Sequence, residues 1–241
     1  MSNNILVMKN VSYKIQGNLI IDRIDLNVKQ EDFIVLVGSN GSGKSSLMKL
    51  ICRQTQPQQG QIIFNGKDSE HYKRKDYAQQ VVMLSQSADA HLCAGMTIEE
   101  HLRLYKMGVS NFHEIDDISG YLQQFNRKLP KYIHRPIDNL SGGEKQMLVL
   151  ALVMLRKPAL LLLDEHTAAL DPKSSDEVMR LTHKMVKAAG ITCIMTTHQV
   201  KHMTPYGNRL IAISQGRVLQ SLNREQNSTA DINHILEQCY A

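Results

Sequence analysis

Three short runs of this sequence combine residue types that could bind and hydrolyse a nucleoside triphosphate. The first is Gly38-Ser39-Asn40-Gly41-Ser42-Gly43-Lys44-Ser45, which fits the pattern Gly-x-x-x-x-Gly-Lys-[Ser/Thr]. Glycine-rich backbone can approach phosphate oxygens closely and donate its N–H groups to them. We expect Lys44 to bind the β- and γ-phosphates and the Ser45 hydroxyl to bind Mg²⁺.

The segments around this loop are those that a phosphate site requires. Residues Phe33–Val37 form an apolar, β-branched run typical of a buried strand, and apolar residues follow at helical spacing from Ser45 to Arg53. A helix that begins at the loop directs free N–H groups and the positive end of its dipole toward a bound anion. A glycine loop that matched the pattern by accident would lack this context.

The second run places two carboxylates at the end of a predicted strand. Residues 159–163 are uninterruptedly apolar, as expected for a parallel strand that is covered on both faces, and Asp164 and Glu165 follow them. Two adjacent carboxylates at a buried strand end are costly unless a cation or a reaction uses them. We interpret Asp164 as a ligand of Mg²⁺ and Glu165 as the residue that activates the attacking water. The alternative is a solvated acidic pair.

The third run, Ser141-Gly142-Gly143-Glu144, has the pattern of a helix capping box, with Ser141 as the N-cap and Glu144 three residues later. It could simply start a core helix. Two glycines directly after the cap disfavour that interpretation, because glycine inside a helix costs up to about 1 kcal/mol. The glycines fit a helix start that an anionic ligand approaches closely.

In this order and spacing the runs resemble the motifs of the ATP-binding subunit of ABC transporters, over nearly the whole chain. The resemblance identifies the phosphate loop as Walker A, residues 140–146 as the signature motif and residues 160–165 as Walker B with its catalytic glutamate. It implies that Gln86 binds Mg²⁺ and senses the γ-phosphate, that His198 contacts the γ-phosphate, and that Tyr13 stacks on adenine. It also identifies residues 168–171 as the D-loop.

The resemblance therefore implies the following functional residues. The catalytic set is Glu165, His198, Lys44 and Gln86, and the Mg²⁺ ligands are Ser45, Gln86 and Asp164. The ATP-binding set is Tyr13, Gly38, Ser39, Asn40, Gly41, Ser42, Gly43, Lys44, Ser45, Ser46, Gln86, Ser141, Gly142, Gly143 and His198.

The sequence departs from the family pattern at three positions near these motifs. His166 occupies a position where proline is most common, and Ala168 occupies one where serine is common. Both flank the catalytic glutamate without removing a reacting group, so they bear on communication between sites rather than on hydrolysis. Asp32 replaces the usual glycine before the first strand, a change compatible with a turn and predicted to have no consequence.

The order of the predicted elements indicates an α/β fold: a P-loop NTPase core of ABC type, with an antiparallel β subdomain and an inserted helical subdomain. We expect one ABC ATPase domain over residues 1–241, with core segments at about 1–86 and 158–241 and the helical subdomain at about 87–157. Within the latter we predict a capping box at Thr97 and a helix over 115–125. We also predict helices over 174–189 and 232–238, and a hairpin over 210–219 with its turn at 215–216.

Composition sets limits on location and partners. No stretch approaches the roughly 20 apolar residues that cross a bilayer, and we read no export leader at the start of the sequence. The four cysteines are scattered, as free thiols would be. A net charge of +5 without aromatic and basic interleaving does not indicate nucleic acid. Apart from His198 and His166, we expect the histidines at the surface. We expect a cytoplasmic protein, peripheral on the inner face of the membrane.

The resemblance also implies partners. Two such subunits, either a homodimer or a pair with a second ATPase subunit, would meet head to tail, so that each ATP lies between one phosphate loop and the other chain's Ser141 motif. Transmembrane permease subunits and an extracytoplasmic solute-binding protein would complete an importer of a small organic solute such as an amino acid; the run 165–172 is reminiscent of importers of branched-chain amino acids. A soluble ABC ATPase of the iron–sulfur cluster assembly type, or an inactive nucleotide-dependent scaffold, remain alternatives.

Overall fold

The computed structural model describes residues 3–108, 117–197, 205–223 and 237. The chain forms two compact units, each made of several segments of the sequence. The first, which we call the sheet unit, comprises Met1–Met83, Ala159–Asp164 and Gly190–Ala241, and the second, the helical unit, comprises Leu84–Pro158 and Glu165–Ala189. The helical unit thus contains a second segment beyond the predicted 87–157, and the predicted subdomain boundaries stay a prediction.

The first sheet of the sheet unit is antiparallel, with the strand order β2-β1-β4-β5. Its two long strands are joined by a tight turn at Gln16 and Gly17, both of which have positive φ, as a two-residue hairpin turn requires. Burial alternates along β2, because one face of the sheet packs on the core and the other faces solvent. The strands are β1 (Asn4–Ile15), β2 (Asn18–Lys29), β4 (Gln59–Phe64) and β5 (Lys67–Asp68).

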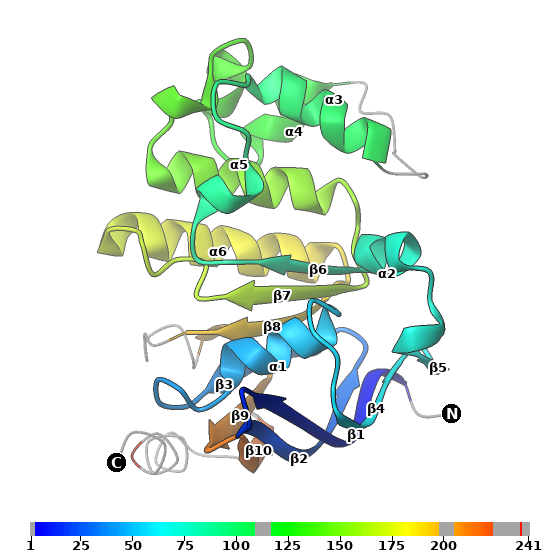
Figure 1. The fold of residues 1–241 in the computed structure, drawn as a ribbon. Coiled ribbons are helices and arrows are strands. Elements are labelled where there is room, and N and C mark those ends of the chain that lie inside the picture. Colours follow the sequence, from blue (N-terminus) through cyan, green and yellow to red (C-terminus); the bar gives the residue numbers. More distant parts are fainter. Residues whose placement is uncertain (1–2, 109–116, 198–204, 224–236, 238–241) are drawn as a thin grey trace. The chain divides into compact units, whose positions relative to one another are not determined.

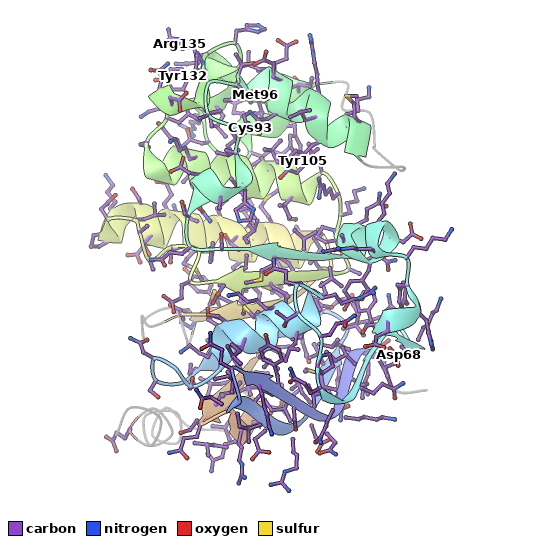
Figure 2. All side chains as sticks on the ribbon, viewed as in Figure 1. Asp68, Cys93, Met96, Tyr105, Tyr132 and Arg135 are labelled. Atoms are coloured by element: carbon purple, nitrogen blue, oxygen red, sulfur yellow. The ribbon has the colours of Figure 1, made fainter. Side chains whose placement is uncertain are left out.

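The second sheet has the strand order β10-β9-β3-β8-β7-β6 (Figure 1). Within it β3 pairs in parallel with β8 and β9, β8 also pairs in parallel with β7, and β10 closes the edge as an antiparallel hairpin with β9. The buried run predicted at residues 33–37 is β3, in which every residue is buried. The other strands are β6 (Val81–Leu84), β7 (Leu160–Asp164), β8 (Thr192–Thr196), β9 (Arg209–Ser214) and β10 (Arg217–Asn223), and two helices of this unit are α1 (Lys44–Ile51) and α2 (Arg74–Gln80).

The helical unit is organised around α5 (Gly142–Met154), in which every residue from Gln146 to Met154 is buried. The other helices of this unit are α3 (Ile98–Gly108), α4 (Ile118–Gln123) and α6 (Pro172–Ala188), with short 3-10 turns at η2 (Ala88–His91), η3 (Leu129–Tyr132) and η4 (Ile137–Asn139); η1 (Ser69–His71) belongs to the sheet unit. No helix in the described ranges is long and apolar enough to cross a membrane.

Helix boundaries differ from the prediction where a capping residue decides them. Helix α4 begins at Ile118 because the Asp117 side chain accepts the Gly120 N–H at 2.8 Å, whereas we expected the helix over 115–125. Helix α6 begins at Pro172, before the predicted Ser174, because Asp171 accepts the N–H groups of both Lys173 and Ser174. The helix expected over 232–238 lies outside the described residues, apart from one position.

The expectation that Asp32 has no consequence is wrong. Its carboxylate accepts the Lys29 N–H at 2.9 Å and the Asn208 side-chain amide at 3.3 Å, and the Arg209 guanidinium lies 3.8 Å away. The Asn208 side chain in turn accepts the Phe33 N–H at 2.9 Å. Asp32 therefore ties the start of β3 to the start of β9, a partner about 175 residues away in the chain that no local pattern indicates.

We predict that Asp32→Ala lowers the free energy of unfolding by about 1–3 kcal/mol, because a buried charged acceptor and its partners lose their hydrogen bonds. The urea unfolding midpoint should shift at unchanged slope. As a control, Glu177→Ala removes an exposed carboxylate on α6 and should stay within about 0.5 kcal/mol of the parent. Equal stability of the two variants would contradict the role of Asp32.

Candidate functional site

The predicted phosphate loop connects the end of β3 to the start of α1, as expected. Its backbone requires glycine: Gly41 and Gly43 have φ of 78° and 107°, and a Cβ on Gly38 would collide with the Ile213 carbonyl oxygen. Among the described residues no side chain caps α1, and its first turn carries no acidic residue. The helix start is therefore left for an external anion, which is the environment that a phosphate prefers.

Lys44 is turned back onto this loop. It is only 6% exposed, and its ammonium donates to the carbonyl oxygens of Gly38 at 2.7 Å and Ser39 at 3.0 Å. These contacts hold a positive charge over the glycine-rich backbone. The next residue of the helix, Ser45, is exposed. The loop thus combines backbone donors, one cation and one hydroxyl, a set that fits the phosphates of a nucleotide.

Strand register brings the first carboxylate to the same edge of the sheet as this loop. In the parallel ladder, Thr196 of β8 pairs with Leu36 of β3 on one side and with Asp164 of β7 on the other. The Thr196 hydroxyl donates to Asp164 Oδ1 at 2.8 Å, which fixes the orientation of that carboxylate. A carboxylate and a hydroxyl at one edge are ligands that Mg²⁺ accepts, usually together with waters and substrate phosphates.

Glu165 follows Asp164 in an unusual backbone conformation. Its φ is 51°, in the left-handed region, and its carbonyl oxygen accepts the Ala168 N–H at 2.9 Å in a tight turn. A non-glycine residue held there costs of order 1–3 kcal/mol, and eight other non-glycine residues in the described ranges also have positive φ. The next residue, His166, is 2% exposed, and its Nε2 lies 3.3 Å from the Thr182 hydroxyl of α6, so the turn is anchored on that helix.

The Ser141 capping box is present as predicted. Ser141 N–H donates to the Glu144 carboxylate at 2.9 Å, and Glu144 N–H donates to the Ser141 hydroxyl at 3.3 Å. Burial opposes ionisation of Glu144, but the Ser141 hydrogen bonds and the Lys128 ammonium at 3.0 Å outweigh it and hold the pKa of Glu144 below its ordinary value. The cap is thus made by a charged carboxylate at neutral pH.

The two signature glycines differ in their surroundings. Gly142 is exposed, whereas Gly143 is buried, and a Cβ on Gly143 would lie 3.3 Å from Ser174 Cβ at the start of α6. A side chain at Gly143 would therefore press on the segment that follows the predicted D-loop. Ser141 and Gly142 are exposed, so a ligand can reach this end of the motif.

Three further residues were predicted to bind ATP: Gln86, Tyr13 and His198. Gln86 is exposed, two residues beyond the end of β6. Tyr13 lies on β1, half-buried and packed against the hydrophobic core of the sheet unit, so its adenine role stays a prediction beside an evident packing role. His198 lies outside the described residues.

The expectation that the remaining histidines lie at the surface is wrong for His101, which is 1% exposed. Its ring is hydrogen-bonded to the backbone at both nitrogens, 2.8 Å from Cys93 N and 2.8 Å from Thr97 O. Sequence reasoning had one available signal: His101 stands four residues after the Thr97 cap, on the apolar face of a helix. In the described residues no cluster of three His, Cys, Asp or Glu side chains could hold a metal ion.

Comparison with known proteins shows the family of the chain. A family model described as ABC transporter matches residues 21–168. The tyrosine transport ATP-binding protein of Clostridioides difficile is 33% identical over 230 residues, covering 92% of each chain. The phosphonates import ATP-binding protein PhnC of Alcaligenes faecalis is 30% identical over 235 residues, covering 93% of this chain and 83% of the relative.

A solved structure has the same fold. The chain cbiO1 of Clostridium perfringens, described as part of the ABC transporter complex cbiONQ, superposes with a TM-score of 0.81 at 24% sequence identity, over 98% of this chain and 99% of that chain. The predicted fold class, an α/β nucleotide-binding core of ABC type with an antiparallel sheet, is confirmed.

The geometry of Glu165 leads to a prediction. We expect Glu165→Gln to lower kcat by about 10²–10⁴-fold, because it removes the group that would deprotonate water, and to leave the ATP dissociation constant within about twofold of the parent. Phosphate release and equilibrium binding of a labelled nucleotide measure the two quantities. Glu177→Gln on exposed α6 is the matched control. Turnover near the parent rate would remove Glu165 from this role.

Proposed function

The chain belongs to the ABC transporter family, whose ATP-binding subunits hydrolyse ATP, and we propose that it is the ATP-hydrolysing subunit of an importer of a small organic solute. The observation that carries the proposal is the ladder Leu36, Thr196 and Asp164, which aligns the phosphate loop and an oriented carboxylate at one sheet edge. That arrangement suits ATP with its Mg²⁺, and the reaction is ATP plus water to ADP and phosphate.

In this proposal different residues bind the phosphates, the adenine and the metal ion of Mg·ATP. Backbone N–H groups of residues 38–46 and the Lys44 ammonium bind the β- and γ-phosphates, and Tyr13 stacks on adenine. Mg²⁺ is held by the Ser45 hydroxyl, the Gln86 side chain and Asp164. When bound, the ion neutralises charge that develops on the phosphate oxygens. Support for the ion comes from the oxygen-only set of ligands and from the orientation of Asp164 by Thr196.

Glu165 takes the proton of the attacking water, and His198 contacts the γ-phosphate. The tight turn at Glu165, supported by His166 on Thr182, suits a base that must be held at one orientation. The turn fixes the backbone from which the carboxylate projects.

We assign the Ser141 motif to the ATP of a second copy of the chain, so that the working form is a head-to-tail dimer. Two observations support this assignment. Ser141 and Gly142 are exposed at the start of α5, and their helix start directs N–H donors outward. A second copy presents the same motif to the first, so two equivalent sites result.

A crosslinking experiment tests the shared site. We expect cysteines introduced at Ser39 and Ser141, in a Glu165→Gln background with Cys52, Cys93 and Cys239 replaced by serine, to form an intermolecular disulfide only when ATP is added. Cys193 is fully buried and can stay. A doubled mass on a non-reducing gel reports the product. A crosslink that is intramolecular, or equally strong without nucleotide, would exclude the shared site.

For the transported compound we propose an amino acid or a similar small organic solute. The tyrosine transport and phosphonates import relatives named above support solute transport, and the second supports import. Solute specificity would reside in a permease and an extracytoplasmic binding protein, and this chain would act at the inner face of the membrane. Helix α3 offers a contact surface for the permease, because Leu104 and Met107, three residues apart, are 47% and 84% exposed.

We expect the chain to co-purify with a polytopic membrane protein, and Leu104→Glu with Met107→Glu to weaken that association at least about tenfold, because a buried charge opposes an apolar contact. ATP binding should not change. Lys75→Glu on exposed α2 is the control. If purification of the native protein recovers only soluble partners, the importer hypothesis is wrong. The alternative function, a soluble ABC ATPase of the iron–sulfur cluster assembly type, then replaces it.

A further inference from the structure

The segment from Ser85 to His101 carries Gln86, and two histidine rings hold its backbone. The first ring is His91 of η2. Its Nε2 lies 3.0 Å from the Ser85 backbone N and 3.0 Å from the Ser85 hydroxyl. A backbone N–H can only donate, so Nε2 of His91 must be the acceptor, and the proton of a neutral ring must sit on Nδ1.

The second ring, His101, constrains the far end of the same segment. Its Nε2 lies 2.8 Å from Cys93 N, which can only donate, and its Nδ1 lies 2.8 Å from Thr97 O, which can only accept. Both contacts are satisfied at once in a single form of the ring, the neutral tautomer with its proton on Nδ1. The ring therefore joins Cys93 to the residue that caps α3.

We propose that His91 is a positioning residue for Gln86, acting through the Ser85 backbone, and that His101 anchors the other end of the segment from which Gln86 projects. Gln86 is exposed and adjoins Ser85 directly, so a change in the Ser85 peptide reorients the Gln86 side chain. This inference rests on the role proposed above for Gln86 in ATP hydrolysis. It adds two residues that touch neither nucleotide nor metal.

The surroundings of His91 favour the neutral ring. Burial lowers the pKa of His91, and this is the cause of its shift. The charged residues of η2 and of α5, which packs against η2, are Asp89, Glu144 and Lys145. Asp89 pairs with Lys145 at 2.8 Å, and Glu144 pairs with Lys128 at 3.0 Å, so each carboxylate already has a cationic partner other than the ring.

The first test is spectroscopic and reads the ring state in the parent protein, with variants used only to assign the signals. In the full-length protein labelled with ¹⁵N-histidine, we expect the His91 and His101 signals at neutral pH to show a neutral ring with the proton on Nδ1. Signals are assigned by their disappearance in His91→Gln and His101→Gln. A protonated ring, or a proton on Nε2 of His91, would overturn the proposal.

The second test is kinetic. We expect His91→Leu to lower kcat by about 10–100-fold with the KM for ATP within about twofold, because the reacting groups are misplaced rather than lost. His91→Gln should recover most of kcat, since its Oε1 can accept the Ser85 N–H where Nε2 did. His71→Leu, at an exposed histidine, is the control and should match the parent. Equal losses in His91→Leu and His91→Gln would overturn the proposal.

A double-mutant comparison separates this inference from the function on which it rests. If His91 acts through Gln86, His91→Leu should cost little further activity in a Gln86→Ala background. A full additional loss there would show a merely structural role and overturn the proposal. If Gln86→Ala keeps the parent kcat, the role proposed for Gln86 is wrong. If Gln86→Ala is impaired but His91→Leu has a normal kcat, only the positioning role of His91 is contradicted.

Discussion

The parallel ladder of β3, β8 and β7 is the constraint on which the rest of the nucleotide site depends. Hydrogen bonding between the strands aligns Leu36, Thr196 and Asp164 side by side in the sheet. The phosphate loop therefore begins at the same sheet edge as the Asp164 carboxylate. A register slip of one residue would turn every side chain of a strand to the opposite face. All three strands are buried, so a slip would displace closely packed side chains, and it would also break the hydrogen bond from the Thr196 hydroxyl to Asp164.

Glu165, the signature motif and Gln86 are positioned by turns and caps instead. Glu165 depends on a left-handed turn anchored by His166, the signature motif on a charged capping box, and Gln86 on a backbone hydrogen bond to an imidazole ring. Each of these residues belongs to the helical unit, whereas the phosphate loop and Asp164 belong to the sheet unit.

Features set by local sequence could be predicted, and those set by distant partners could not. The run at residues 33–37 is β3, and the capping boxes at Thr97 and Ser141 are present, because each depends on residues within one turn or strand. Asp32 was misjudged because its partners Asn208 and Arg209 lie far along the chain. The burial of His101 had one local signal, its position on the apolar face of a helix, whereas nothing in the local sequence indicates the positive φ of Glu165. The roles of individual site residues stay predictions that experiment must test.

The central claim is that ATP is hydrolysed at a site made by two chains, and the rate per chain measured against protein concentration tests it most directly. With saturating Mg·ATP, dilution over about 100-fold should lower the phosphate released per chain once the dimer begins to dissociate, and the loss should reverse on concentration. A rate per chain that stays constant over that range, with the protein shown to be monomeric throughout, would contradict the account, because one chain would then suffice for hydrolysis.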